Sequence, residues 1–148
     1  MRKHLSCLSI ALIWCFSISA QIPNIRIGPE KVSGYQPCEP SIAISQTDPN
    51  IIVAGSILDN VYRSEDGGVT WSHQKLTSSH GVFGDPCVVS SPLGDFYYLH
   101  LSDPDNAGWK SEKLLDRIVC QRSTDGGKTW SDGGGMGEQH PKDQDKEW

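Results

Sequence analysis

Seven residues beyond position 20 could ligate a transition metal or act as nucleophiles: Cys38, Cys87, Cys120, His73, His80, His100 and His140. The cysteines are odd in number and widely spaced, so they predict neither a disulfide framework nor the paired ligands of a zinc site. The histidines show no metal-ligand spacing, and no cysteine stands with a histidine in an arrangement that would indicate a thiolate nucleophile. We therefore expect the cysteines to be small, buried apolar residues, and we expect no cofactor.

Acidic residues in glycine-rich loops could instead bind calcium. Asp66 and Asp125 each precede a Gly-Gly pair, but each loop carries a single carboxylate, too few for Ca²⁺. Residues 103–108 begin like an EF-hand loop, yet Ala107 occupies the fifth position and Leu114 stands where the terminal glutamate belongs. The sequence therefore predicts no metal site.

The two Gly-Gly loops belong to an internal repeat. Residues 64–71, Ser-Glu-Asp-Gly-Gly-Val-Thr-Trp, recur as residues 123–130, Ser-Thr-Asp-Gly-Gly-Lys-Thr-Trp, with six of eight positions identical. Upstream, residues 39–45 parallel residues 85–91 in the same order. We infer that one structural unit has been duplicated.

The repeated motif has the composition of a hairpin loop. Its glycines supply positive φ, its aspartate can accept backbone N–H bonds, and its hydroxyl groups can satisfy the remaining polar groups. The tryptophan is expected to pack back on its own sheet. These structural residues are Ser64, Asp66, Gly68, Thr70, Trp71, Ser123, Asp125, Gly127, Thr129 and Trp130.

Each unit contains four strand candidates bounded by turn residues. In the first unit they are residues 41–45, 51–57, 61–64 and 71–76; in the second they are residues 87–91, 96–101, 118–123 and a weak strand at Trp130, with an insertion over 103–116. Four antiparallel strands per repeat predict β-propeller blades in an all-β fold. We place one blade at 39–77, a second at 85–131 and the start of a further blade near 145–148.

Composition and the amino terminus restrict the class of protein. The chain has 15 glycines and nine prolines, which favours many short strands, and its net charge of −5 argues against nucleic-acid binding. Residues 1–20 resemble a secretory signal peptide, with basic residues first and small residues at the end. The apolar run from Leu5 to Ile18 is shorter than the roughly 20 residues of a membrane span, which disfavours an anchor. We expect cleavage near Ala20, a segment over 21–38 that leads into the first blade, and a secreted or periplasmic protein.

Both copies of the loop motif match the pattern Ser-x-Asp-x-Gly-x-Thr-Trp, which is the Asp-box or bacterial neuraminidase repeat (BNR repeat). Together with Glu39-Pro40-Ser41-Ile42-Ala43-Ile44 and Gly84-Asp85-Pro86, this pattern makes residues 39–148 resemble the start of a sialidase-like β-propeller of the exo-α-sialidase type. The resemblance implies six blades, with the Asp-boxes on the outer rim and a glycan or sialoglycoconjugate at the axial face. It also implies that this chain is an N-terminal portion of about two blades, which needs the remaining blades for ring closure.

The resemblance further implies a site with three arginines, a tyrosine nucleophile paired with a glutamate, and an aspartate acid/base. Arg26, in Ile-Arg-Ile-Gly, is a weak match to the family's Phe-Arg-Ile-Pro segment and also suits a structural role. Asp59 is the positional candidate for the acid/base, although Asp59-Asn60 also suits a tight turn. Asp85 begins the second unit's first strand, where Glu39 occupies the equivalent place in the first unit, so a repeated structural role is favoured for it.

Two classes of function follow. The first is a secreted glycosidase of the exo-α-sialidase type, of which this chain is an incomplete and inactive portion. The second is a non-catalytic Asp-box propeller that binds glycans or proteins, because a fold alone does not determine a function. Neither alternative requires a cofactor.

Overall fold

The computed structural model of the 148-residue chain describes residues 24–28 and 37–137. The expected signal peptide and the expected start of a further blade near 145–148 lie outside these residues. Within the described part, no helix is long and apolar enough to cross a membrane.

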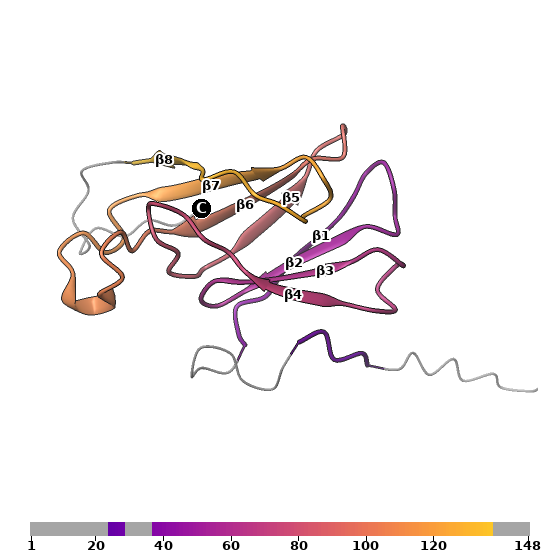
Figure 1. The fold of residues 1–148 in the computed structure, drawn as a ribbon, viewed down its shortest axis with the longest axis horizontal. Helices are drawn as coiled ribbons and strands as arrows, with labels where there is room; N and C mark the ends of the chain where they lie inside the picture. Colours follow the sequence, from indigo (N-terminus) through magenta and orange to yellow (C-terminus); the bar gives the residue numbers. More distant parts are fainter. Residues whose placement is uncertain (1–23, 29–36, 138–148) are drawn as a thin grey trace, which may run out of the picture.

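The described chain forms two four-stranded antiparallel sheets, each with its strands in sequence order (Figure 1). The first sheet comprises β1 (Ser41–Ile44), β2 (Ile52–Ser56), β3 (Asn60–Ser64) and β4 (Ser72–Lys75). The second comprises β5 (Cys87–Ser90), β6 (Phe96–Leu101), β7 (Ile118–Ser123) and β8 (Gly134–Met136), with a short 3-10 helix, η1 (Gly108–Lys110), between β6 and β7. The expectation of an all-β chain with two four-stranded units is confirmed.

The last strand of the second unit differs from the expectation. The sequence predicts a weak strand at Trp130, whereas β8 begins at Gly134 and pairs with β7 from Cys120↔Gly134 to Ile118↔Met136. The indole of Trp130 packs against the core cluster instead, and the chain turns at Gly133, whose φ is +91°. Edge pairing therefore starts only after this turn.

Strand register separates each sheet into two faces. In the first sheet the pairs Ala43↔Val53 and Ile42↔Ala54 put Ala43 and Val53 on one face and Ile42 and Ala54 on the other. The face with Val53 is directed at the second sheet and is called the inner face of the first sheet. In the second sheet the inner face carries Val88, Phe96 and Tyr98, and the outer face carries Cys87, Val89, Tyr97, Leu99 and Cys120.

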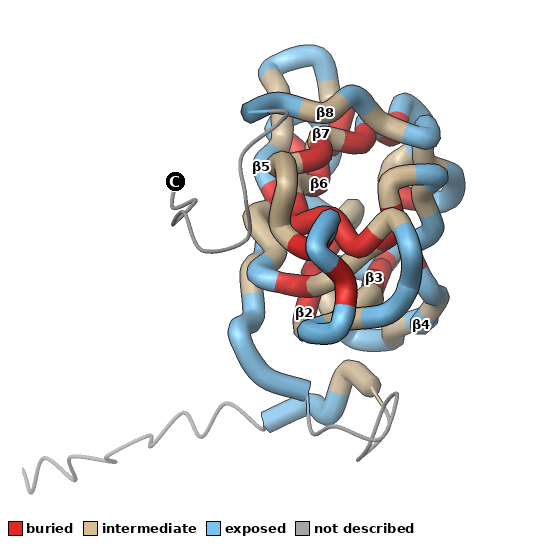
Figure 2. The backbone as a smooth tube through the Cα atoms, turned by 90° about the vertical axis from the view of Figure 1, so that its left-hand side faces the viewer, coloured by how far each residue is buried: buried red, intermediate tan, exposed pale blue. Residues whose placement is uncertain are grey.

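The hydrophobic core lies between the two inner faces. It consists of Val53, Val61, Leu76, Val88, Phe96 and Tyr98. In Figure 2 the buried segments gather where the sheets face one another. A Cβ on Gly55 would lie 2.6 Å from the Tyr98 hydroxyl oxygen, so the first sheet needs a glycine here to admit the tyrosine ring. The Tyr98 hydroxyl donates to the Asn60 carbonyl oxygen across the junction, at 3.2 Å.

The first strands of the two units lie beside each other. β1 contacts β5, and the Val88 N–H donates to the Ser41 hydroxyl oxygen at 2.9 Å. Because both strands run from the same end, the residues that precede them, Glu39 and Asp85, come together. The pairing Ile44↔Ile52↔Ser64 places the Asp-box loops at the opposite end of the first sheet.

Candidate functional site

The first Asp-box loop closes on itself through its own side chains. The Asp66 carboxylate accepts from the Thr70 backbone N–H at 2.8 Å, from the Thr70 hydroxyl at 2.6 Å and from the Ser64 hydroxyl at 2.8 Å. The Gly68 N–H donates to the Ser64 hydroxyl oxygen at 2.8 Å, and the Trp71 indole N–H donates to the Gly68 carbonyl at 2.9 Å. The hydrogen bonds from Thr70 lower the pKa of Asp66 to about 2, so the loop holds it as a carboxylate.

The second loop repeats this network. The Asp125 carboxylate accepts from the Thr129 N–H at 2.9 Å, from the Thr129 hydroxyl at 2.6 Å and from the Ser123 hydroxyl at 2.8 Å. Burial works against ionisation of Asp125, but these bonds outweigh it and lower its pKa to about 2. The carboxylate is thus occupied by its own loop, as the hairpin interpretation expects.

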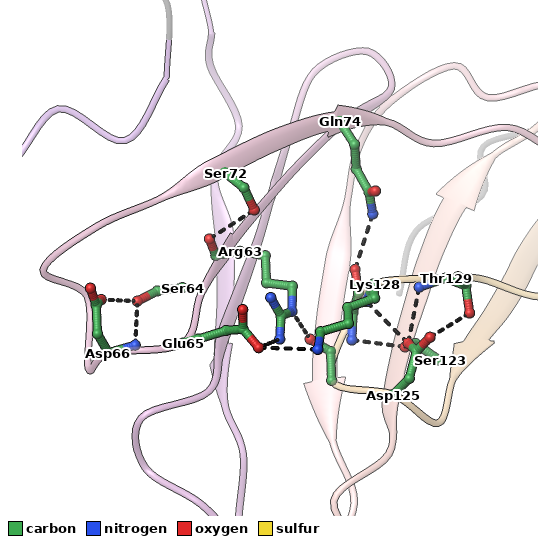
Figure 3. Close-up of polar contacts among 12 residues, drawn as sticks. Arg63, Ser64, Glu65, Asp66, Ser72, Gln74, Ser123, Asp125, Lys128 and Thr129 are labelled. Atoms are coloured by element: carbon green, nitrogen blue, oxygen red, sulfur yellow. Dashed lines mark hydrogen bonds and ion pairs between the residues drawn. The ribbon is translucent and has the colours of Figure 1, made fainter.

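The second loop also holds the two sheets together (Figure 3). Arg63 Nε donates to the Gly126 carbonyl at 2.6 Å, and the Gln74 side chain donates to the Gly127 carbonyl at 3.0 Å. Glu65 forms ion pairs with Arg63 at 2.6 Å and with Lys128 at 3.2 Å. The hydrogen bonds from Arg63 and Lys128 lower the pKa of Glu65 to about 2. These hydrogen bonds and ion pairs connect the first sheet to the loop of the second sheet.

The structure does not bring Arg26, Asp59 and Asp85 together. Arg26 lines an apolar groove of about 350 Å³ on the outer face of the first sheet, together with Gly28 and Tyr62. Asp59 lies in the turn between β2 and β3 and forms an ion pair with Lys75. The turn comprises residues 57–59, since Asn60 is already the first residue of β3. Asp59 therefore has a structural partner in β4, the strand that contains Lys75.

Asp85 and Glu39 form a carboxyl pair at the start of the two first strands. Burial, a hydrogen bond with Asp85 and the charge of Asp85 together raise the pKa of Glu39 above its ordinary value. Both residues have a left-handed backbone, with φ of +52° at Glu39 and +50° at Asp85, and each is followed by a proline. Non-glycine residues adopt this conformation at a cost of about 1–2 kcal/mol. The repeated Glu/Asp-Pro element thus brings two carboxyl groups together with strained backbone on both sides.

A cleft of about 510 Å³ opens beside this carboxyl pair. Its lining residues are Glu39, Ile57, Leu58, Phe83, Asp85, Ala107, Gly108, Trp109 and Lys110. Trp109, in η1, is 70% exposed, and its ring meets that of Phe83 edge to face at 5.7 Å. Trp109 is not among the sequence-predicted site residues, and the available signal for it is a tryptophan within the polar insertion 103–116. The cleft thus presents the aromatic ring of Trp109, the carboxyl groups of Glu39 and Asp85 as hydrogen-bond acceptors, and the Lys110 side chain as a cation.

The described cysteines are all free, and Cys38 is exposed, so the expectation of a buried residue there is wrong. Cys87 and Cys120 are half-buried on the outer face of the second sheet. No group of three or more His, Cys, Asp or Glu side chains in the described ranges is placed to hold a metal ion.

Comparisons with family models, with curated proteins and with solved structures give no match to this chain.

Proposed function

We propose that residues 39–137 are two adjacent blades of a sialidase-like Asp-box β-propeller. Three observations support this proposal: the duplicated four-stranded sheets, their face-to-face packing, and the contact between their first strands. In a propeller the first strand of each blade lies innermost, so β1 and β5 would border the axis. The Asp-box loops, at the far end of the first strands, then serve the junction between blades.

We propose further that the cleft beside Glu39 and Asp85 binds glycans. The observation that carries this is the convergence of two carboxyl groups, from equivalent positions of the repeat, on a cleft walled by an exposed tryptophan. A sugar offers hydroxyl donors to carboxylate oxygens and an apolar C–H face to an indole ring. The carboxyl pair repels a second carboxylate, so neutral sugars are favoured over sialic acid.

Sialoside hydrolysis by this chain is the second candidate, and we propose that it does not occur. Neither Arg26 nor Asp59 lines the cleft beside the carboxyl pair, and Asp59 forms an ion pair with Lys75. Electrostatic catalysis depends on groups preorganised around one reacting centre, which this arrangement does not supply. A fluorogenic sialoside that is hydrolysed by the purified chain, with loss of turnover in Asp59→Ala, would contradict this proposal.

Binding can be tested on an array of neutral and sialylated oligosaccharides, followed by titration of the best ligand by isothermal titration calorimetry. We expect Trp109→Ala and Asp85→Asn each to weaken binding at least about tenfold, equivalent to about 1.4 kcal/mol. Asp48→Asn is the matched control, since Asp48 lies in the turn after β1, at the far end from the cleft. Absence of glycan binding, or equal binding by Trp109→Ala, would refute the assignment.

A further inference from the structure

Each sheet buries its inner face and leaves its outer face without a sheet partner in the described chain. The outer face of the first sheet exposes Ile42 and Ile44, at 62% and 55%. The outer face of the second sheet exposes Val89 at 44%, and Met136 of β8 is exposed at 50%. These β-branched and apolar side chains stand on regular strands, where water contact is unfavourable.

The repeat relates each outer face to the inner face of the other sheet, whose contacts the structure shows. Aligning residues 39–45 with 85–91 places Ile42 at the position of Val88, and the strand registers then place Ile52 at Phe96. The outer face of the first sheet is therefore the counterpart of the second sheet's inner face. Val88 and Phe96 are 5% and 0% exposed because the first sheet covers them.

The same alignment makes the second sheet's outer face the counterpart of the first sheet's inner face. Val89 takes the place of Ala43, and Cys120 takes that of Val61. Arg122 corresponds to Arg63, which reaches the neighbouring Asp-box loop at the Gly126 carbonyl. Among the described residues Arg122 contacts no such loop: its side chain is 53% exposed and pairs with Asp95, which directly precedes β6.

We propose that two copies of this chain dock head to tail, with the outer face of the second sheet of one copy against the outer face of the first sheet of the next. The contact uses positions equivalent to those of the junction between the chain's own sheets, with Leu99 and Ala54 in the places of Gly55 and Tyr98. It is heterologous, so repetition closes a ring when the rotation per unit allows it. Propellers close with four to eight blades, which corresponds to two to four copies.

The described residues 26–28 cover only part of the outer face of the first sheet. Gly28 lies on the Tyr62 ring, where a Cβ would approach to 2.4 Å, so residues 26–28 cover the Tyr62 part of the face. Beside them the apolar groove of about 350 Å³ remains, bounded by Ile42 and Ala54. This groove can receive side chains of the incoming sheet. The proposal rests on the packing of the two sheets and is independent of glycan binding.

Light scattering after size-exclusion chromatography of the full chain, over a hundredfold range of concentration, tests the proposal. We expect a concentration-dependent rise in mass to two to four copies. Val89→Lys and Ile42→Lys, which charge one outer face each, should both give monomers. Leu93→Lys is the matched control, because Leu93 is 85% exposed in the loop between β5 and β6, outside both faces.

Mixing the two face variants gives the decisive result. Each variant retains one intact face, so an equimolar mixture should form a 1:1 dimer that grows no further, which also shows that both variants are folded. Cys87 and Cys120, on the outer face of the second sheet, should become protected from thiol reagents as the wild-type concentration rises. A wild-type monomer at every concentration, or a mixture that stays monomeric, would overturn the proposal and assign these faces to a different partner.

Discussion

Two glycines at the same place in the two Asp-box loops provide a matched test of the junction. Gly68 and Gly127 have φ of +91° and +85°, so alanine at either position suffers the same backbone strain. Their surroundings differ. A Cβ at position 68 would lie 3.6 Å from Ile52 and 3.7 Å from Trp71, which is ordinary contact, whereas a Cβ at position 127 would lie 2.6 Å from Val53 Cγ2.

The expected magnitudes follow from these distances. A left-handed backbone at a non-glycine residue costs about 1–2 kcal/mol, and this is the whole expected loss for Gly68→Ala. Gly127→Ala adds the overpacking of a core side chain that is 0% exposed, which costs about 1–3 kcal/mol more. The free energy of unfolding should therefore fall clearly further for Gly127→Ala than for Gly68→Ala.

Urea unfolding followed by tryptophan fluorescence measures both losses. Val53→Ala removes the methyl group that the new Cβ would meet, so the extra cost at Gly127 should shrink in a Val53→Ala background, with a coupling of about 0.5–3 kcal/mol. Equal losses for the two alanine variants, or additive losses with Val53→Ala, would show that the second loop does not press against the first sheet as described.

Two further predictions concern the same loops. The pKa of Asp66 and of Asp125 falls from 3.8 to about 2 on folding. Their contribution to stability is therefore complete above the unfolded pKa and is lost as the pH falls from about 4 to 2. Urea unfolding midpoints measured between pH 2 and 6 should show this loss, and the pH dependence of the midpoint should be weaker in Asp125→Asn. Trp71→Phe should cost about 1 kcal/mol for the lost bond to the Gly68 carbonyl, and a variant as stable as the wild type in thermal unfolding would contradict the assignment. Trp130→Phe breaks no hydrogen bond among the described residues, so its cost should come from lost packing against the core and Tyr98.

The sequence is most informative where local chemistry decides the structure. The Asp-box loops follow from their own residues, since Ser64, Asp66 and Thr70 satisfy one another within a few positions. The strand-forming residues and the turn residues that bound them locate the ends of β1 to β7 within one or two residues, because these signals are also local in the sequence. β8 escapes prediction because Gly134 and Gly135 carry no strand signal, and their pairing depends on the turn at Gly133. Trp130 has a strong strand propensity, but its burial against Tyr98 takes precedence.

The candidate cleft was beyond sequence reasoning for a different reason. Its parts come from four separated segments, namely residues 39, 57–58, 83–85 and 107–110, which only the packing of two sheets brings together. Asp85 is a sequence candidate because it begins the second unit's first strand, and the equivalent position of Glu39 in the first unit favours a structural role for it. The φ values of +52° and +50° show that both positions adopt the same unusual backbone. Glu39 and Asp85 lie together because they occupy equivalent positions at the start of β1 and β5, which contact each other.

The two ends of the strands differ in how far their polar groups are already occupied. The Asp-box loops lie at one end, and the cleft beside Glu39 and Asp85 lies at the other. At the Asp-box end, Asp66 and Asp125 have hydrogen-bonding partners inside their loops, and the Gly126 and Gly127 carbonyls accept bonds from the neighbouring sheet. Such groups have little capacity left for a ligand, and the second loop uses its carbonyl groups to hold the two sheets together. At the other end, each repeat contributes one carboxylate to a common position beside the first strands. At this end the duplication sets two carboxyl groups side by side in a cleft that also presents Trp109 and Lys110, and this is why we propose binding there.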